Sequence, residues 1–484
     1  MNRILIPGKT CWRIERAGRQ RVIIDAADYF VAVKAAMLKA RHSIMLIGWD
    51  FDTRIRFEAE HQTLEGPNRL NRLLKWLVKR EPGLQVRVLK WDLGMLQALS
   101  RGMMPIVLAN LASRRRLHIK LDGKHPAGAA HHQKIVVIDD SIAFCGGIDM
   151  TVGRWDTREH RDDDTRRRSP QGKPLGPWHD ATMIVDDAAA RTIGDIARER
   201  WEDATGEHLQ PVTATDDAWP DGLEPALRDV DIAVARTLPE LDERAEVREI
   251  EALYLAGIRH ARHTLYLESQ YLAARRLAEA LAQRLAEPDG PEVIIVLPEC
   301  IDDSWLEHEA MDSARTRLLH MLWDADRHHR LGAYYPVTRN GTSIYVHAKI
   351  MIVDDVLLRV GSSNLNNRSM GFDTECDLAI EAADDDVTLR RHVQAVRRDL
   401  LCEHLDTDVD TFDARMTQAE GSVLSVVETL RGSGHTLQPF DPALMTDGES
   451  PLAENELLDP EHVAGGFGTR LWFGVSKLLG HRRR

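Results

Sequence analysis

Hydrophobic residues along the chain follow two alternating patterns, one typical of helices and one typical of buried strands. Upstream of a first Arg-His pair, apolar side chains recur at helical spacing at Phe30, Val33, Met37 and Ala40. Upstream of a second Arg-His pair they recur in the same way at Ile250, Tyr254, Ile258 and Ala261. A compact apolar run follows each pair, SIMLIGW in one place and TLYLESQY in the other. Each region is therefore expected to form a helix followed by a strand.

The two regions belong to an internal duplication that spans most of the chain. Further compact apolar runs, QVRVLKWD at 85–92 and EVIIVLPE at 292–299, predict another strand in each copy. Each copy then reaches an HxK motif, an apolar run and a glycine turn, in HHQKIVVIDDSIAFCGGID and VHAKIMIVDDVLLRVGSSN. The interval between the HxK motifs nearly equals the interval between the Arg-His pairs, which favours two homologous halves over chance similarity.

Strands that alternate with helical patterns predict an α/β fold. We expect two α-β-α sandwich halves, each with a mixed, mostly parallel sheet, packed as a pseudo-twofold with one active site between them. The expected boundaries are 1–202 for the first half, 203–245 for a connector, 246–410 for the second half and 411–484 for a C-terminal extension. Residues 157–176, rich in charge, Gly and Pro, are expected to form a surface loop. The acidic segment 438–462 is expected to be a flexible tail.

Composition narrows the class of protein without changing this fold. Hydrophobic residues make up 43% and charged residues 29% of the chain, as in ordinary globular proteins, which argues against disorder. The net charge of -13 argues against a basic nucleic-acid-binding protein. The five cysteines are scattered without CxxC spacing, so neither a cysteine zinc site nor a disulfide framework is expected. The sequence shows no signal peptide and no long apolar stretch, so we expect a cytoplasmic location, at most peripheral on the inner face of a membrane.

The HxK motifs carry the chemistry. In a strand, residues i and i+2 point to the same face, so His132 and Lys134 project together, as do His347 and Lys349. Facing halves would bring these four side chains into one cleft. One imidazole can attack phosphorus and the other can protonate the leaving alkoxide, while the ammonium groups stabilise the phosphate oxygens. This set cleaves a phosphodiester without a metal or other cofactor, and none is expected.

With these motifs the chain resembles the phospholipase D superfamily, whose signature is HxKxxxxD followed by a Gly-Gly or Gly-Ser turn. The resemblance covers roughly residues 25–405 and extends to the eukaryotic-type phospholipases D and their bacterial relatives. It rests on HHQKIVVID, AFCGGIDMTVGRWD and PWHD in the first copy. In the second copy it rests on ESQY, GSSNLNNRS, TECDLAI and RRDLLCEHL. The resemblance implies a phospholipase D or transphosphatidylase that forms phosphatidic acid through a phosphohistidine.

The resemblance also implies roles for individual residues. His132 corresponds to the nucleophile and His347 to the general acid and base. Lys134, Lys349 and Asn364 correspond to phosphate-binding positions.

Two acidic residues match those that orient the histidines, namely Asp180 and Glu375. Asp139 and Asp354 complete the catalytic motif, but their places at the strand ends lead us to expect turn or salt-bridge roles. Asp149 stands where many relatives have Asn, and its carboxylate would repel a phosphate.

Other residues are candidates for substrate or surface binding. Ser362, in the second glycine turn, and Gln270 are expected to line the cleft. The arginine runs 114–116 and 166–168 could bind anionic head groups or form solvated faces. Residues 467–484 combine apolar positions at helical spacing with arginines, a pattern of an interfacial anchor on anionic lipid or of a helix that packs on the protein's own core.

Several functions remain open at this stage. The first is phospholipase D acting on a phospholipid as a single chain. A cardiolipin synthase-type phosphatidyltransferase would use the same chemistry. A nuclease is disfavoured by the net charge, and no nucleic-acid partner is expected. A lipid-binding scaffold would need neither the histidines nor the lysines.

Overall fold

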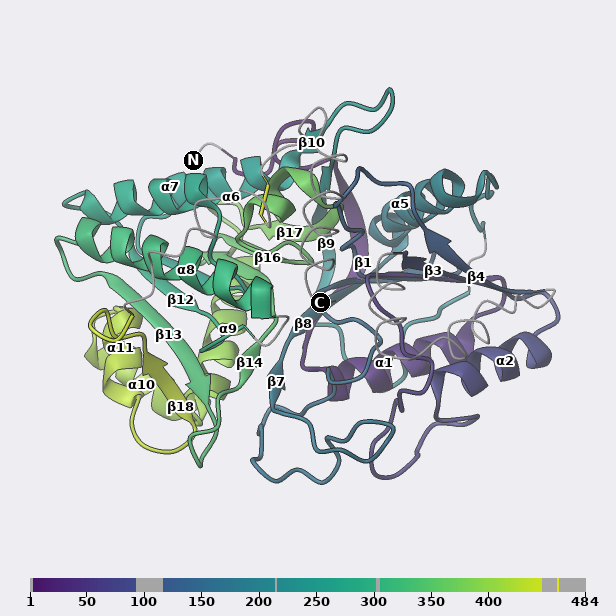
Figure 1. Cartoon of the computed structure of the whole chain (residues 1–484), viewed down its shortest axis with the longest axis horizontal. Helices are drawn as coiled ribbons and strands as arrows, with labels where there is room; N and C mark the ends of the chain where they lie inside the picture. Colours follow the sequence, from purple (N-terminus) through teal and green to yellow (C-terminus); the bar gives the residue numbers. More distant parts are fainter. Residues whose placement is uncertain (1–2, 93–115, 214–215, 302–304, 446–458, 461–484) are drawn as a thin grey trace, which may run out of the picture.

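The apolar runs and amphipathic segments form strands and helices that assemble into one 16-stranded mixed sheet with helices on both faces (Figure 1). The computed structural model describes residues 3–92, 116–213, 216–301, 305–445 and 459–460. The first half contributes β1 (Arg13–Ile24), α1 (Ala26–Lys39), β2 (Ser43–Gly48), α2 (Leu70–Arg80), β3 (Gln85–Trp91), β4 (Leu117–Asp122), β5 (Ile135–Ile138), β6 (Ile142–Gly146), β7 (Trp178–His179), β8 (Ala181–Asp186) and α5 (Asp187–Thr205). The second half contributes β9 (Leu227–Leu238), β10 (Val247–Arg248), α6 (Glu249–His260), β11 (Thr264–Glu268), α7 (Arg275–Ala286), β12 (Glu292–Val296), α8 (Trp305–Ala325), β13 (Leu331–Val337), β14 (Tyr345–Val346), β15 (Ile350–Val353), β16 (Leu357–Gly361), η1 (Arg368–Phe372), β17 (Glu375–Glu381), α9 (Val387–His404), α10 (Val409–Gln418), α11 (Val423–Leu430) and β18 (Thr436–Pro439).

Both parts of the chain add strands to the sheet in the same spatial order. From the edge to the centre, the first reads β4-β3-β2-β5-β6-β8-β1 and the second reads β13-β12-β11-β15-β16-β17-β9, with β18 outside β13. β1 and β9 pair antiparallel at the centre and join the two parts into a single sheet. The predicted α/β fold is confirmed. The segment 203–245, expected as a connector, contains the central strand β9, and the expected extension supplies α10, α11 and β18.

The prediction of mostly parallel sheets is wrong. Within the described strands of the large sheet, parallel pairing is confined to β2 with β3, β3 with β4, β11 with β12, and β12 with β13. The strands after each HxK motif instead form the hairpins β5–β6 and β15–β16. The hairpin turns contain Asp139 and Asp354, both at φ 52°, a left-handed conformation that suits a tight turn. A tight turn joins antiparallel strands, whereas parallel strands need a long crossover.

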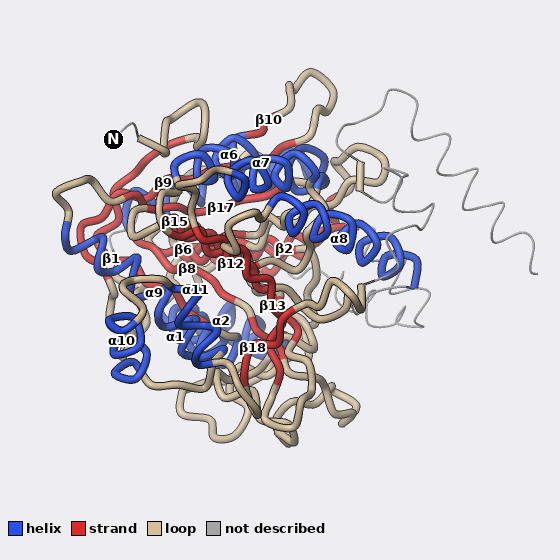
Figure 2. The backbone as a smooth tube through the Cα atoms, turned by 90° about the vertical axis from the view of Figure 1, so that its left-hand side faces the viewer, coloured by secondary structure: helices blue, strands red, loops and turns tan. Residues whose placement is uncertain are grey.

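The sheet separates its core into layers. Alternate residues of β2 face opposite sides: Met45 and Ile47 pack in the core that includes α5 and α9, and Ile44 and Leu46 pack against α1 and α2. In the second half, α6, α7 and α8 cover the face opposite α9. Figure 2 shows α6, α7 and α8 on one side of the strands and α9, α10 and α11 on the other. Among the described residues, no helix has the length and apolar character needed to cross a bilayer.

A separate two-stranded sheet ties the two halves together beside the HxK motifs. β7 pairs parallel with β14, with Trp178 opposite Tyr345 and His179 opposite Val346. His347 follows β14 directly, and its backbone N–H donates to the carbonyl of His179 at 2.8 Å. The second motif is thereby fixed against the PWHD segment of the first half.

Candidate active site

Each HxK motif lies in the extended segment just before a hairpin, where the opposite half of the chain holds its histidine. The backbone N–H of His132 donates to the carbonyl of Thr374 at 3.0 Å, and that of His347 donates to the carbonyl of His179 at 2.8 Å. The histidine of each half is thus bound to the main chain of the other half. This reciprocal arrangement brings the two motifs into one site.

The side chains repeat this crossing. His132 Nδ1 lies 2.9 Å from Glu375 Oε1, and His347 Nδ1 lies 2.7 Å from Asp180 Oδ2. A carboxylate that accepts the Nδ1 proton fixes the imidazole tautomer and leaves the lone pair on Nε2. Each ring is therefore oriented with an unprotonated Nε2, whose lone pair is available for reaction. The side chain of His132 is 15% exposed and that of His347 is 4% exposed, so His132 is the more accessible.

The two carboxylates are buried and held by different partners. Glu375 also accepts hydrogen bonds from the hydroxyls of Ser362 at 2.5 Å and Ser369 at 2.7 Å. Asp180 accepts one from the backbone N–H of Ala181 at 2.8 Å. Burial raises the pKa of Glu375 to about 7 and the pKa of Asp180 to about 6. Both groups therefore change charge close to neutral pH.

The two lysines supply positive charge inside the site. The Lys134 ammonium donates to the carbonyl of His132 at 2.9 Å, and the Lys349 ammonium donates to the carbonyl of His347. Burial lowers the pKa of Lys349 to about 7. Burial, followed by repulsion from the two lysines, also lowers the pKa of His132 well below its ordinary value. For His347, burial and then Lys349 lower the pKa in the same way, so both imidazoles are neutral before an anion binds.

The carboxylate of Asp149 forms an ion pair with Lys134. It lies 3.3 Å from the Lys134 ammonium and is buried. This contact explains why a carboxylate is tolerated where a phosphate contact would be repulsive, since it pairs with a cation of the site. A direct role in substrate binding is not supported by this geometry.

The remaining predicted substrate-binding residues differ in what their side chains contact. Asn364 is buried, and its side-chain oxygen has no hydrogen-bond partner among the described residues, which suits a ligand-binding amide. Gln270 donates to the hydroxyl of Tyr345 at 2.9 Å beside β14. Ser362, expected to line the cleft, is fully buried and gives its hydroxyl to Glu375, so it supports the acid instead.

Asp139 and Asp354 of the HxK motifs hold turns. The Asp139 carboxylate accepts the backbone N–H groups of Arg41, His42 and Ser43, and that of Asp354 accepts those of Arg262, His263 and Thr264. Each acid joins its hairpin to the start of β2 or β11. These contacts match the turn role expected from their places at the strand ends and leave neither acid in the catalytic set.

Sequence reasoning missed a cationic and aromatic wall beside His347. The ring of Trp178 stacks on that of Tyr345 at 4.5 Å between centroids and lies 5.2 Å from the ring of His347. The Arg154 guanidinium lies 4.0 Å from the centroid of Trp178. Arg154 and Trp178 belong to the strings GRWD and PWHD, but no spacing rule in the sequence assigns them to one wall.

The segments that the sequence suggests for surface binding lie partly within and partly outside the described residues. Arg167 is buried and pairs with Asp156 at 2.9 Å, so the middle of the 166–168 run is structural. Residues 114, 115 and 467–484 lie outside the described residues. Within the described part of the chain, the groups with a geometry that suits a metal ion are Asp25, His160, His179 and Glu403, and the adjoining His179, Glu268 and His404. Neither group contains a residue of the HxK motifs.

Comparison with known proteins identifies the family. A family model described as "Phospholipase D" matches residues 36–276, and one described as "Cardiolipin synthase, PLD-like domain" matches residues 254–397. The chain is 24% identical to phospholipase D alpha 4 of Arabidopsis thaliana, over 86% of this chain and 68% of that protein. It is 24% identical to phospholipase D A of Dictyostelium discoideum, over 76% of this chain but 33% of that protein.

The fold has a counterpart among solved structures. Phosphatidylserine synthase of Haemophilus influenzae Rd KW20 superposes with a TM-score of 0.52 at 12% identity, covering 85% of this chain and 96% of that one. Since the two family models together span residues 36–397 and both HxK motifs lie within them, the chain belongs to the phospholipase D superfamily.

Proposed function

We propose that the chain is a phospholipase D-type phosphodiesterase that transfers the phosphatidyl group of a glycerophospholipid to water or an alcohol. The crossed pair of hydrogen bonds, His132 to Glu375 and His347 to Asp180, carries this proposal. It provides two oriented imidazoles in one site, which is what a two-step displacement at phosphorus needs. The names of the relatives, phospholipase D, support the same class of reaction.

In the first step, Nε2 of His132 attacks phosphorus and the bond from phosphorus to the head-group oxygen breaks. His347 gives its Nε2 proton to the leaving alkoxide, which departs as an alcohol. The bound phosphodiester carries a negative charge that raises the pKa of His347 and so loads it with the proton. Lys134, Lys349 and Asn364 contact the non-bridging oxygens and stabilise their charge.

In the second step, His347 removes a proton from water or an acceptor alcohol as its oxygen attacks phosphorus. The bond from phosphorus to His132 breaks, which yields phosphatidic acid or a new phosphodiester and restores both imidazoles. The assignment of His132 as nucleophile follows the family resemblance and agrees with its greater exposure.

A cardiolipin synthase-type transferase is the second candidate, supported by the family model over residues 254–397. It differs only in the acceptor, which would be the glycerol hydroxyl of a second phospholipid. The chemistry of the histidines would be unchanged.

Both candidates are separated by one assay. Purified protein is incubated with vesicles of phosphatidylcholine, phosphatidylethanolamine or phosphatidylglycerol, with and without ethanol. Formation of phosphatidic acid, and of phosphatidylethanol when ethanol is present, identifies a phospholipase D. Formation of cardiolipin as the product, with phosphatidylglycerol as the substrate, identifies the transferase. Loss of product in His132→Ala and His347→Ala, with activity kept in the exposed control His208→Ala, assigns the products to this site. Cleavage of single-stranded DNA without lipid turnover would refute both.

A further inference from the structure

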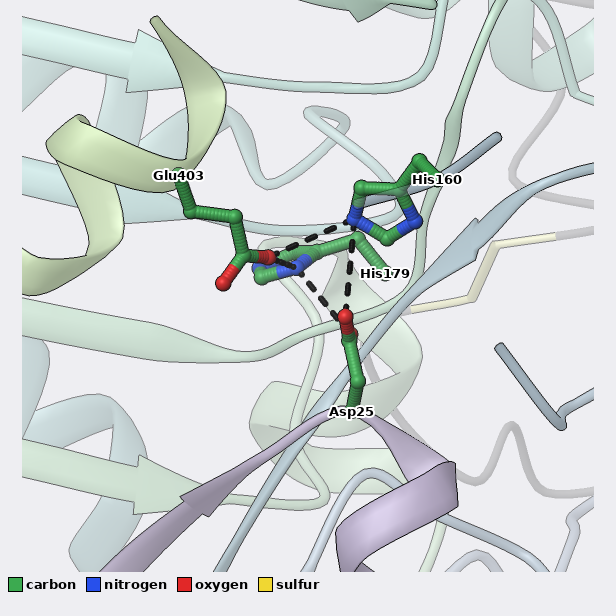
Figure 3. Close-up of side chains that lie close together, drawn as sticks. All are labelled: Asp25, His160, His179 and Glu403. Atoms are coloured by element: carbon green, nitrogen blue, oxygen red, sulfur yellow. Dashed lines mark hydrogen bonds and ion pairs between the residues drawn. The ribbon is translucent and has the colours of Figure 1, made fainter. Parts of the chain in front are cut away.

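A second cluster of histidines and acids lies in the interior of the protein (Figure 3), and one of its members, His179, directly precedes Asp180 of the candidate active site. Its four members come from distant parts of the chain. Asp25 precedes α1, His160 belongs to the 157–176 loop, His179 lies in β7, and Glu403 lies near the end of α9. All four side chains are at most 1% exposed. We call them the buried tetrad.

In the buried tetrad, one ring nitrogen of each histidine lies within 3.5 Å of both carboxylates. His179 Nδ1 lies 2.8 Å from Glu403 Oε1 and 3.3 Å from Asp25 Oδ1. His160 Nε2 lies 3.3 Å from Glu403 Oε1 and 3.5 Å from Asp25 Oδ2. A tetrahedral zinc ion with bonds of about 2.0–2.1 Å places its ligand atoms about 3.3 Å apart. The nitrogen-to-oxygen distances of 2.8–3.5 Å bracket this spacing, and one ligand atom from each of the four residues lies within 4.8 Å of the others, which is close enough for small shifts to enclose such an ion.

Each histidine of the buried tetrad is held from behind by a carboxylate. His160 Nδ1 lies 2.9 Å from Asp156 Oδ2, and His179 Nε2 lies 2.9 Å from Glu268 Oε2. Metal-binding histidines in proteins regularly donate their second ring N–H in this way, which fixes the tautomer and makes the ligating nitrogen more basic. The outer carboxylates therefore leave the inner nitrogens as the lone-pair donors.

Two ligand atoms point into the buried tetrad without a hydrogen bond. Among the described residues, neither His179 Nδ1 nor Asp25 Oδ2 has a hydrogen-bond partner, although oppositely charged groups stand nearby. His179 Nδ1 in particular has a carboxylate oxygen at 2.8 Å in poor alignment for an N–H donor. Figure 3 shows the four side chains directed toward one another. A ring nitrogen that lies between two carboxylates without an aligned hydrogen bond to either is placed as a metal ligand would be.

Charge balance also leaves room for a divalent cation. The buried carboxylates of the tetrad and its surround are Asp25, Asp156, Glu268 and Glu403. The guanidinium groups paired with them are Arg158 and Arg167. With neutral imidazoles, these groups sum to a charge of two negatives, and buried charges without compensation are strongly destabilising.

We propose that Asp25, His160, His179 and Glu403 form a closed tetrahedral site for one Zn²⁺ ion. Two imidazoles with two carboxylates suit zinc, whereas Mg²⁺ and Ca²⁺ prefer six or more oxygen ligands. The site is structural, because the four protein ligands complete the coordination and the side chains are closed from solvent. The proposal does not rest on the proposed function, since no residue of the HxK motifs takes part.

The ion would stabilise the acid that orients His347. Asp25 Oδ1 also accepts the backbone N–H of Asp180 at 3.1 Å, and the carbonyl of His179 accepts that of His347 at 2.8 Å. Metal binding at Asp25 and His179 therefore fixes the backbone on both sides of the Asp180 side chain. The chemistry at phosphorus stays metal-free, while its geometry depends on the ion.

The alternative to a metal ion is protonation of both histidines of the buried tetrad. Burial lowers the pKa of His160, but Asp25 and the other carboxylates outweigh it and raise the pKa to about 10. Two imidazolium ions would supply the same positive charge as one Zn²⁺. The experiment must therefore detect the metal itself.

The first test is elemental analysis of the full chain, purified through a tag without histidines from zinc-supplemented medium. About one zinc per chain is expected after gel filtration in metal-free buffer. Glu403→Gln and His160→Ala should reduce it at least tenfold. His435→Asn is the matched control, since its ring lies 5.9 Å from that of His160 without belonging to the tetrad. Zinc absent from the wild type, or retained in full by both tetrad variants, overturns the proposal.

The second test works even where those variants fail to fold. Zinc K-edge spectroscopy of the wild type should show four nitrogen or oxygen neighbours at about 2.0–2.1 Å and no sulfur. Removing the ion with a chelator should lower the Tm, and adding Zn²⁺ back should restore it, more than Mg²⁺ does. A Tm that is indifferent to chelation and to Zn²⁺ leaves the imidazolium network as the occupant.

Discussion

The two histidines of the active site have the same covalent motif but different surroundings. His132 is the more exposed, its acid Glu375 is held by serine hydroxyls, and its lysine is paired with Asp149. His347 is enclosed, lies against Trp178, and its acid Asp180 is held through the backbone. An accessible imidazole suits attack on phosphorus, and an enclosed one suits controlled proton transfer. On the proposed mechanism, the two copies of one motif take different roles because their surroundings differ.

Replacing either of the two histidines should have the largest effect on activity. Both His132→Ala and His347→Ala are expected to lower kcat at least about 10⁴-fold on natural phospholipid. With a nitrophenyl phosphodiester, which leaves without protonation, His347→Ala should still release a burst of nitrophenol by forming the phosphoenzyme. His132→Ala should not. Rapid-quench kinetics measures the burst, and a burst in His132→Ala alone would reverse the assigned roles.

Replacing either of the two acids should have the second largest effect on activity. Glu375→Gln and Asp180→Asn remove the carboxylate that fixes the Nδ1 tautomer and are expected to lower kcat about 10²- to 10³-fold with little change in KM. Glu428→Gln, a glutamate that pairs with Tyr334 and Arg431 elsewhere, is the control. Activity within twofold of wild type in either site variant would show that its histidine needs no acid.

The pH profile sharpens the comparison further. The pKa of Glu375 is raised to about 7, so its carboxylate is lost as the pH falls and kcat/KM should decline on the acid side. The pKa of Lys349 is lowered to about 7, so its charge is lost as the pH rises and kcat/KM should decline on the alkaline side. Lys349→Arg keeps the charge and should abolish the alkaline decline, at a cost of about tenfold at neutral pH. An unchanged alkaline limb would assign it to another group.

Ser362→Ala should have the smallest effect. Loss of its hydrogen bond removes support from the Glu375 anion and raises the pKa of that acid further. Activity at pH 6 should fall about two- to tenfold, with little change at pH 8. The exposed Ser425→Ala serves as control. A uniform loss at both pH values would instead indicate that Ser362 contacts the substrate.

The sequence predicts more of the active site than of the strand pairing in the sheet. The HxK motifs can be recognised in the sequence because they are linear motifs, and the family resemblance assigns Asp180 and Glu375 to the histidines that they contact in the structure. The antiparallel pairing of most strands could not be predicted, because apolar runs such as IVVI and IMIV fit either pairing direction. The role of Ser362 was missed because its partner depends on how β16 packs beside β17.

The wall of Arg154 and Trp178 and the buried tetrad share one reason for being missed. Trp178 meets Tyr345 through the pairing of β7 with β14, and the buried tetrad gathers residues 25, 160, 179 and 403, so both arise only in the folded chain. A sequence pattern registers neighbours along the chain, so residues such as Asp25 and Glu403 give no signal of a common site.

The crossed hydrogen bonds have a consequence for the order in which the protein becomes reactive. His132 precedes its acid Glu375 by 243 residues, so a ribosome completes the first histidine long before its carboxylate emerges. A half-synthesised chain holds an imidazole without its orienting partner. On the proposed mechanism, catalytic competence therefore depends on the folding of the second half, and a chain truncated before Glu375 carries the proposed nucleophile without its orienting acid.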